Sequence, residues 1–341
     1  MNIKLHGWLA QYAVLTILFV AGCRDTTSPP TNNGSILTGP TLLVPVGAVR
    51  SPRGITVDAR GGIWVSDMQS DLVRRFGSSG TLRDSIPGIP LPTNMGFDKS
   101  TGNVLVVANN TTIYRIDTLT MNVNIVSVLT SSSIDTSSVY DVNLDTLRPQ
   151  AINNINLLGD VDGAPNGDVW VNIFANGDKN FVVRVAAGSA KAMAYSSAPA
   201  SPSDIGPKFL AVDTFGDVFT AFVTGANPGS SRVRVYRVTP INITGSRPMT
   251  EPIISGGSRG AGIDIGGVLF IADTPIQKMV IVSTDRESTL EALIVPPVPG
   301  MSEPAPTDIS VGTDGSVYVA IEDLFSTPGQ PGAVLKYGRA P

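Results

Sequence analysis

The stretch "GITVDARGGIWVSD", residues 54–67, has the pattern of two short strands joined by a tight turn. Large apolar residues recur on either side of a polar centre, as expected for strands that bury at least one face. Asp58 can accept hydrogen bonds from the backbone amides that follow it, and Gly61 supplies the positive φ that tight turns require. The stretch therefore predicts an antiparallel hairpin.

The same pattern returns five times along the chain, which makes it an internal repeat. It recurs as residues 95–109, 158–172, 209–222, 262–273 and 308–321, with turn glycines at Gly61, Gly102, Gly167, Gly216, Gly266 and Gly315. A large apolar residue follows each glycine by three positions: Trp64, Leu105, Trp170, Phe219, Leu269 and Tyr318. We expect this series to pack in the core between repeats, because equivalent mid-strand positions are usually buried.

Most units continue with a third strand, such as "LVRRF" (72–76) or "KMVIV" (278–282), and with a weaker fourth strand. Four short strands repeated every ~40–50 residues are typical of a β-propeller blade. The sequence thus predicts an all-β, six-bladed β-propeller with four-stranded antiparallel blades. Residues 130–154 are short and polar, and we interpret them as an inserted loop.

The ends of the repeat region predict how the ring closes. The sixth unit stops after its third strand, "AVLKY" (333–337), whereas the apolar segment "TLLVPVGAV" (41–49) precedes the first unit. Strand edges left unpaired favour aggregation. We therefore expect strand 41–49 to complete the last blade and close the propeller.

These units resemble known propeller repeats. The stretch "PRGITVDARGGIWVSDMQSDLVRRFGSSGTL" is similar to the NHL repeat, and "IADTPIQKMVIVS" resembles its second half. The wider relatives of such repeats are six-bladed propellers, including the SMP-30/gluconolactonase group. The resemblance spans residues 41–341 and implies a fold more strongly than an activity.

The first residues predict export and lipid attachment. Lys4 and an apolar run from Leu9 to Val20 are followed by "VAGC", which ends at Cys23, the sole cysteine. This pattern is typical of a secretory signal, and it resembles the lipobox of bacterial lipoproteins. The resemblance implies a signal peptide over 1–22, lipidation of Cys23 with fatty acyl chains such as palmitate, and membrane anchoring. Residues 23–40 comprise that Cys and a polar, flexible linker, and residues 41–341 form the propeller.

Composition excludes several kinds of chemistry. Lys and Arg number 24 against 28 Asp and Glu, which argues against a nucleic-acid partner. The single histidine, His6, lies in the predicted signal peptide. The mature chain would therefore lack Ser-His-Asp and Cys-His nucleophilic sites, and also zinc or copper sites made of imidazole or thiolate.

Metal binding is the main alternative to a site without a cofactor. In gluconolactonase-like enzymes the resemblance implies one divalent ion held by a Glu, an Asn and an Asp at the starts of inner strands. Here the corresponding phrase "SPRGI" (51–55) has no Glu, Lys208 follows Pro207 where that group has an Asp, and Asn94 is a shifted match for the Asn. Two of the three ligands are therefore missing. Asp160 and Asp162 lie in a stretch faintly similar to a calcium loop, but the acidic residue that completes such a loop is absent. We therefore predict no cofactor, with Ca²⁺ or Mg²⁺ as the alternative.

Loop length points to a binding face. The long segments mostly follow the second strands or link the units, so they fall on one face of a propeller. Long loops on a rigid scaffold commonly carry binding residues, although surface loops also tolerate insertions at little cost. The candidate binding residues on this face are Asp71, Asn109, Asn110, Asn176, Asp178, Lys179, Asn180, Asp204, Glu322 and Asp323.

The preferred functional hypothesis is a non-catalytic, membrane-anchored, extracytoplasmic lipoprotein. Its propeller would bind a protein, a peptide or an envelope glycan, with no catalytic residues of its own. The alternative is an SMP-30/gluconolactonase-like metal-dependent hydrolase or lactonase, and a purely structural spacer is a third hypothesis. Arg24 after the lipidated Cys implies the outer membrane as the destination, with the domain facing the periplasm or the cell surface.

Overall fold

The computed structural model describes residues 35–340, with gaps at 143, 145, 190, 200–208, 225–231, 239–245, 255–257, 287 and 325–329. Residues 36–341 form one compact unit. The predicted signal peptide, Cys23 and most of the predicted linker lie outside the described residues, so lipidation stays a prediction. Within the described part of the chain, no helix has the length and apolar character needed to cross a membrane.

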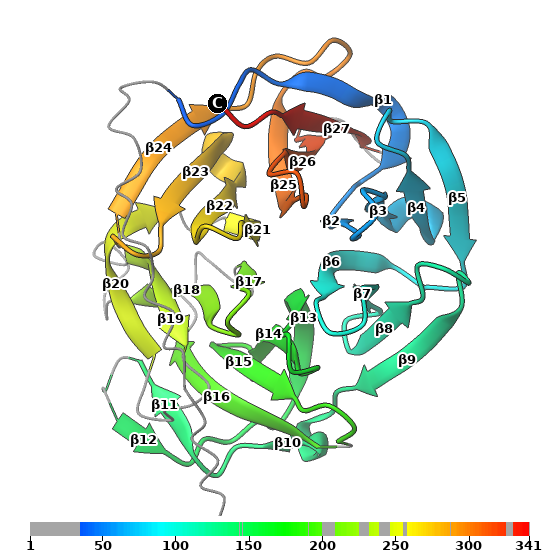
Figure 1. Ribbon diagram of the computed structural model, residues 1–341. Helices are drawn as coiled ribbons and strands as arrows, with labels where there is room; N and C mark the ends of the chain where they lie inside the picture. Colours follow the sequence, from blue (N-terminus) through cyan, green and yellow to red (C-terminus); the bar gives the residue numbers. More distant parts are fainter. Residues whose placement is uncertain are drawn as a thin grey trace, which may run out of the picture. The chain divides into compact units, whose positions relative to one another are not determined.

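The described residues form six antiparallel or mainly antiparallel sheets, numbered here by chain order (Figure 1). Sheet 1 contains β2 (Ile55–Val57), β3 (Ile63–Asp67), β4 (Leu72–Phe76) and β5 (Leu82–Pro87). Sheet 2 contains β6 (Pro92–Asp98), β7 (Asn103–Ala108), β8 (Thr112–Ile116) and β9 (Val123–Val128). Sheet 4 contains β17 (Leu210–Val212), β18 (Val218–Thr224), β19 (Arg232–Val238) and β20 (Ser246–Ile254).

The remaining sheets include the two with strands from elsewhere in the chain. Sheet 5 contains β21 (Ser258–Ile263), β22 (Val268–Asp273), β23 (Lys278–Ser283) and β24 (Ser288–Ile294). Sheet 6 contains β25 (Pro304–Val311), β26 (Val317–Asp323), β27 (Pro331–Tyr337) and β1 (Thr41–Arg50). Sheet 3 contains β13 (Ile155–Gly163), β14 (Val169–Ala175), β15 (Lys179–Val185) and β16 (Ala192–Pro199), extended by β10 (Ile134–Asp135), β11 (Val139–Asp141) and β12 (Thr146–Arg148). Short 3₁₀ turns lie at Met68–Ser70, Ser131–Ser133 and Thr274–Ile276.

The prediction of an all-β propeller with mainly antiparallel four-stranded blades is confirmed. Five of the sheets formed by the described residues have four strands each. The first strand of each sheet (β2, β6, β13, β17, β21 or β25) contacts the first strand of the sheet before it and of the sheet after it, and β25 contacts β2. These inner strands surround a common centre (Figure 1).

The interpretation of residues 130–154 as an inserted loop is wrong. This segment contains β10, β11 and β12, and both β10 and β11 pair in parallel with the outer strand β16. Ile134 and Val139 are buried against the core of sheet 3. The segment is polar in composition, but its few apolar side chains suffice to attach it to the free edge of β16.

Strand β1 lies at the outer edge of sheet 6. It pairs antiparallel with β27, from Thr41 opposite Lys336 to Arg50 opposite Pro331, with two irregularities in register. Val44 and Val49 of β1 are buried. An isolated bridge between Leu37 and Arg339 extends the contact, so chain packing begins inside the segment predicted as a linker.

The core fills the spaces between neighbouring sheets. Trp64, Trp170, Phe219 and Tyr318 are all buried, as predicted, and each packs with residues of the next sheet. Tyr318 of sheet 6, for example, packs with Ile55 and Ile63 of sheet 1. One turn glycine is corrected: in sheet 5 the positive φ belongs to Gly267 rather than Gly266.

Candidate functional site

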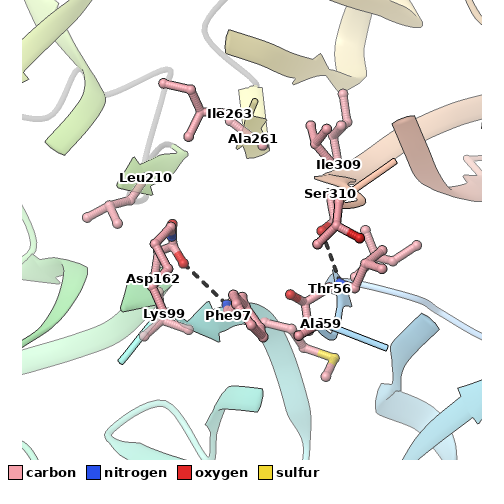
Figure 2. A pocket seen from close by; sticks show the side chains of 18 residues that line it. Thr56, Ala59, Phe97, Lys99, Asp162, Leu210, Ala261, Ile263, Ile309 and Ser310 are labelled. Carbon is pink, nitrogen blue, oxygen red and sulfur yellow. Dashed lines mark hydrogen bonds and ion pairs between the residues drawn. The ribbon is translucent and has the colours of Figure 1, made fainter. Parts of the chain in front are cut away.

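The inner strands enclose a cavity of about 100 Å³ at the centre of the described structure (Figure 2). Its walls are mainly aliphatic, with residues from all six inner strands or the segments that follow them. Thr56, Lys99, Asp162 and Ser310 supply its polar side chains, together with Thr313. A cavity of this size and character accommodates a few waters or a small ligand group, so any larger ligand must bind at its mouth.

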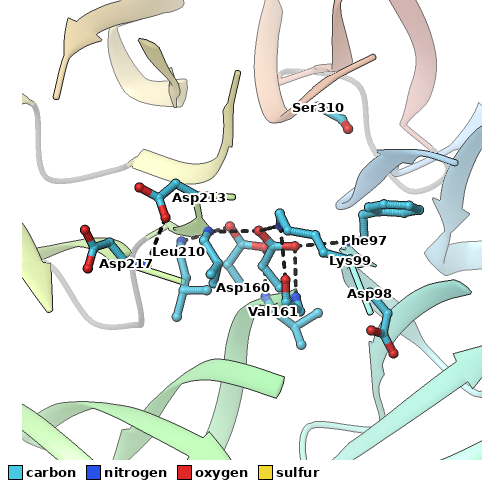
Figure 3. Close-up of polar contacts among 12 residues, drawn as sticks. Phe97, Asp98, Lys99, Asp160, Val161, Leu210, Asp213, Asp217 and Ser310 are labelled. Atoms are coloured by element: carbon cyan, nitrogen blue, oxygen red, sulfur yellow. Dashed lines mark hydrogen bonds and ion pairs between the residues drawn. The ribbon is translucent and has the colours of Figure 1, made fainter. Parts of the chain in front are cut away.

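Two buried carboxylates connect inner strands to one another. Asp160 of β13 accepts hydrogen bonds from the backbone N–H of Leu210 in sheet 4 (2.9 Å) and of Val161 (2.9 Å). Asp308 of β25 accepts from the N–H of Ile55 in sheet 1 (2.7 Å) and of Ile309 (2.7 Å). Both side chains lock the inner strand of one sheet to that of the next, as Figure 3 shows for Asp160 and Leu210.

Electrostatics mark these two carboxylates as unusual. Burial raises the pKa of Asp160 well above its ordinary value, and the charge of Asp308 raises it further. Burial likewise raises the pKa of Asp308, although the hydrogen bonds from Ile55 and Ile309 oppose that shift. Because their oxygens already accept backbone N–H groups, we assign both residues a structural role.

Asp162 and Lys99 form the ion pair of the cavity wall. Lys99 Nζ lies 2.7 Å from Asp162 Oδ2 and 3.2 Å from the Gly163 carbonyl oxygen. Asp162 also accepts from the N–H groups of Phe97 (3.2 Å) and Val212 (2.8 Å). The faint calcium-loop pattern of residues 159–168 is therefore a hairpin whose aspartates bind protein amides, as the other repeats suggested.

Four predicted binding residues adopt left-handed turn conformations. Asp71, Asn109, Asn110 and Asn176 have φ of 51°, 48°, 61° and 58°. Asp and Asn tolerate this region better than other non-glycine residues. Asp71 also accepts from the N–H of Leu91 (2.8 Å), and Asn176 accepts from the N–H of Asn153 (2.8 Å). The turn geometry alone explains these residue types, and ligand binding by them stays a prediction.

The other predicted residues differ in environment. Asp178 is exposed, Lys179 Nζ donates to Gln150 Oε1 (2.9 Å), and Asn180 is buried with no hydrogen-bond partner for its amide among the described residues. Asp323 accepts from the N–H groups of Ser302 (2.8 Å) and Glu303 (3.0 Å), which fixes the loop before β25. Asp204 lies outside the described residues.

Glu322 is the predicted residue around which other side chains converge. Its side chain, only 1% exposed, receives Arg53 Nη1 at 2.9 Å and Arg259 Nη1 at 2.8 Å, both on Oε1. Arg53 precedes β2 of sheet 1, Arg259 lies in β21 of sheet 5, and Glu322 lies near the end of β26 in sheet 6. We call these three residues the arginine pair site. It lies at the end of the channel where the inner strands begin.

Sequence reasoning missed Arg53 and Arg259. A signal was present, because both precede a glycine at the start of an inner strand, in "PRGI" (52–55) and "SRGAGI" (258–263). The predicted ring of six units places both phrases beside the sixth unit, but nothing in the sequence indicated that the two side chains meet at Glu322. Only the arrangement of sheets 5, 6 and 1 brings both guanidinium groups to one carboxylate.

The described residues do not fit the divalent ion of gluconolactonase-like sites. No group of three or more His, Cys, Asp or Glu side chains in the described ranges could hold a metal ion. At the starts of β2 and β21 stand Arg53 and Arg259, whose positive charges repel a metal ion. Asp308, the carboxylate beneath them, is occupied by backbone N–H groups.

Comparison with solved structures supports the propeller fold. A gluconolactonase from Xanthomonas campestris matches with a TM-score of 0.57 and 13% identity, over 88% of this chain and 89% of that one. A calcium-binding regucalcin from Agrobacterium tumefaciens matches with a TM-score of 0.53 and 13% identity, over 89% and 96%. A luciferin-regenerating enzyme matches with a TM-score of 0.57 and 14% identity, over 88% and 95%.

The similarity is one of fold. No family model and no curated protein matches the sequence. At 13–14% identity the solved structures show the fold alone, which is a β-propeller. Activity has to be argued from the residues of this chain.

Proposed function

We propose that this chain is a six-bladed β-propeller, closed by β1, which binds a small ligand at the arginine pair site. Support for six blades comes from the six sheets and from the contacts between consecutive inner strands. Support for closure comes from the pairing of β1 with β27. The observation that carries the site is the convergence of Arg53 and Arg259 on the buried Glu322.

The first activity to test is hydrolysis of a small lactone or ester. The fold neighbours include two proteins described as gluconolactonases and a regucalcin, which favour a small-molecule enzyme over a scaffold. When bound, a divalent ion in such enzymes would polarise a carbonyl oxygen. Because the described residues do not fit that ion, the contribution we assign to this chain is ligand binding by Arg53 and Arg259.

The second candidate is a non-catalytic module that binds a protein, a peptide or an envelope glycan. It is favoured by arginines at inner-strand starts where the resemblance to gluconolactonases implies carboxylate and amide ligands. The carboxylates Asp160, Asp162 and Asp308, all engaged by protein donors, support the same candidate.

Turnover and ion uptake separate the two candidates. The full chain in detergent would be assayed against a panel of aldonolactones and aryl esters, with Ca²⁺, Mg²⁺ or a chelator. A hydrolase should give a rate above the protein-free control that the chelator abolishes. Absence of turnover, together with no ion uptake at about millimolar concentration in equilibrium dialysis, would count against the hydrolase.

We also propose that Cys23 is lipidated and tethers the propeller to a bacterial membrane, with the outer membrane as the favoured destination. The sequence pattern around Cys23 supports this proposal. Labelling with a clickable palmitate analogue should mark the wild-type chain and not Cys23→Ala. Equal labelling of both would overturn it.

A further inference from the structure

We propose that the arginine pair site binds a small carboxylate, held by the exposed N–H groups of Arg53 and Arg259. This inference rests on the proposed use of this channel mouth, but it concerns binding and does not require turnover. It assigns a ligand class that differs from a divalent cation in charge.

The charges at this mouth are separated by depth. Glu322, Asp67, Asp273 and Asp323 are all buried there. By contrast, the side chain of Arg53 is 25% exposed and that of Arg259 is 43% exposed. A ligand arriving from solvent therefore meets guanidinium groups first, and the carboxylates lie beneath them.

Both arginines have N–H groups left to offer. Each guanidinium carries five N–H donors, and among the described residues each uses one of them on Glu322 Oε1. Because both bind the same oxygen, they stand side by side at a fixed spacing. Two planar guanidinium groups held together match the two oxygens of a carboxylate.

Contacts of the backbone next to each arginine fix the spacing between the two guanidinium groups. The N–H groups of Arg53 and Gly54 donate to Ser66 Oγ at 3.1 and 2.8 Å. Gly260, next to Arg259, packs so closely on the Asp308 carboxylate that a Cβ there would collide with it. The same carboxylate accepts the N–H of Ile55. Asp308 thus positions the strand of each arginine, one on either side of β25.

Glu322 holds the two guanidinium groups from beneath. Its Oε2 is buried and has no hydrogen-bond partner among the described residues, so a ligand arriving from solvent does not reach it. Burial raises the pKa of Glu322, and the charge of Arg259 opposes that rise. We therefore assign Glu322 the role of positioning Arg53 and Arg259, which contact the ligand.

Titration calorimetry with lactate and lactamide tests the proposal, because only lactate carries a carboxylate. The full chain in detergent should bind lactate, and lactamide about tenfold more weakly. Arg53→Met and Arg259→Met should each weaken lactate binding by about tenfold or more. Arg53→Lys and Arg259→Lys keep the charge and should still lose several-fold, because Lys lacks the planar fork.

The matched control is Arg115→Met, which removes a partly exposed arginine from another buried carboxylate, Asp98, at the opposite face. It should bind lactate like the wild type. No lactate binding by the wild type, or equal loss in the Arg115 control, would overturn the site. Equal affinity for lactate and lactamide would overturn recognition of a carboxylate by the two arginines. A wild type that binds lactate but hydrolyses no lactone would contradict the proposed hydrolase activity and leave the binding site intact.

Discussion

Sheets 3 and 6 lie on opposite sides of the channel (Figure 1). In both, a buried aspartate on the inner strand binds the backbone of the next sheet. Asp160 and Asp308 occupy equivalent repeat positions, and each accepts the first inner-strand N–H of the next sheet. Two positions later Asp162 and Ser310 also make equivalent contacts, because they accept the N–H of Val212 (2.8 Å) and of Val57 (3.1 Å). The sheets differ there in that only Asp162 carries a charge, which pairs with Lys99.

The second strands of the two sheets differ more. Phe174 in β14 occupies the repeat position that Glu322 occupies in β26, and both side chains are buried. An apolar residue therefore satisfies the fold at this position. Burying a carboxylate there is unfavourable unless it is paired. Glu322 and its two arginines are thus not required by the propeller, which favours a role in binding.

We expect the largest loss of stability from a substitution in β1, the N-terminal strand that pairs with sheet 6. Val44→Asp places a charge at a fully buried position of β1, against the core between sheets 6 and 1. We expect a loss of about 4 kcal/mol in the free energy of unfolding, or aggregation through the exposed edge of β27. Urea denaturation and light scattering would measure these effects. Wild-type stability in this variant would contradict closure by β1.

Removing Asp160 from sheet 3 or Asp308 from sheet 6 should lower stability by similar amounts. Asp160→Ala and Asp308→Ala each leave two buried N–H groups without an acceptor, at about 1–3 kcal/mol per group. We expect similar losses for the two variants in urea denaturation. A loss confined to one of them would mean that sheets 3 and 6 are not locked in the same way.

The pH dependence of stability sharpens this comparison. The raised pKa values of Asp160 and Asp308 mean that the folded state holds protons more tightly than the unfolded state. Their contribution is thus fully present below the unfolded pKa of about 3.9 and is lost as pH rises through the folded values. Stability of the wild type should fall with rising pH relative to Asp160→Asn and Asp308→Asn, which cannot ionise. Parallel urea curves from about pH 4 to about pH 8 check this, and a constant difference would contradict it.

The smallest stability effect should occur where the sheets differ most. Glu322→Leu replaces the buried charge with an apolar side chain, as Phe174 does in sheet 3. We expect a change in the free energy of unfolding within about 1 kcal/mol, together with loss of lactate binding. A strongly destabilised Glu322→Leu would show instead that the carboxylate is needed to hold Arg53 and Arg259 in the fold.

Local patterns accounted for most of the fold. Alternating apolar residues, with Asp and Gly in the turns, predicted the hairpins at 54–67 and at the five later repeats, because strand and turn preferences act over a few residues. The strands of segment 130–154 could not be predicted in this way, since β10 and β11 exist by pairing with β16, far along the chain. The binding residues proposed from loop position included Glu322 but neither of its arginines.

The sequence by itself determined the repeat, the burial of the aromatic series and the absence of histidine after the predicted signal peptide, because each is a property of short segments or of composition. Only the tertiary structure decided that the side chains of Arg53 and Arg259, which lie on either side of sheet 6, meet at Glu322. The physical reason is that inner strands distant in sequence are brought together by packing around the channel. Side-chain convergence of that kind has no local sequence pattern.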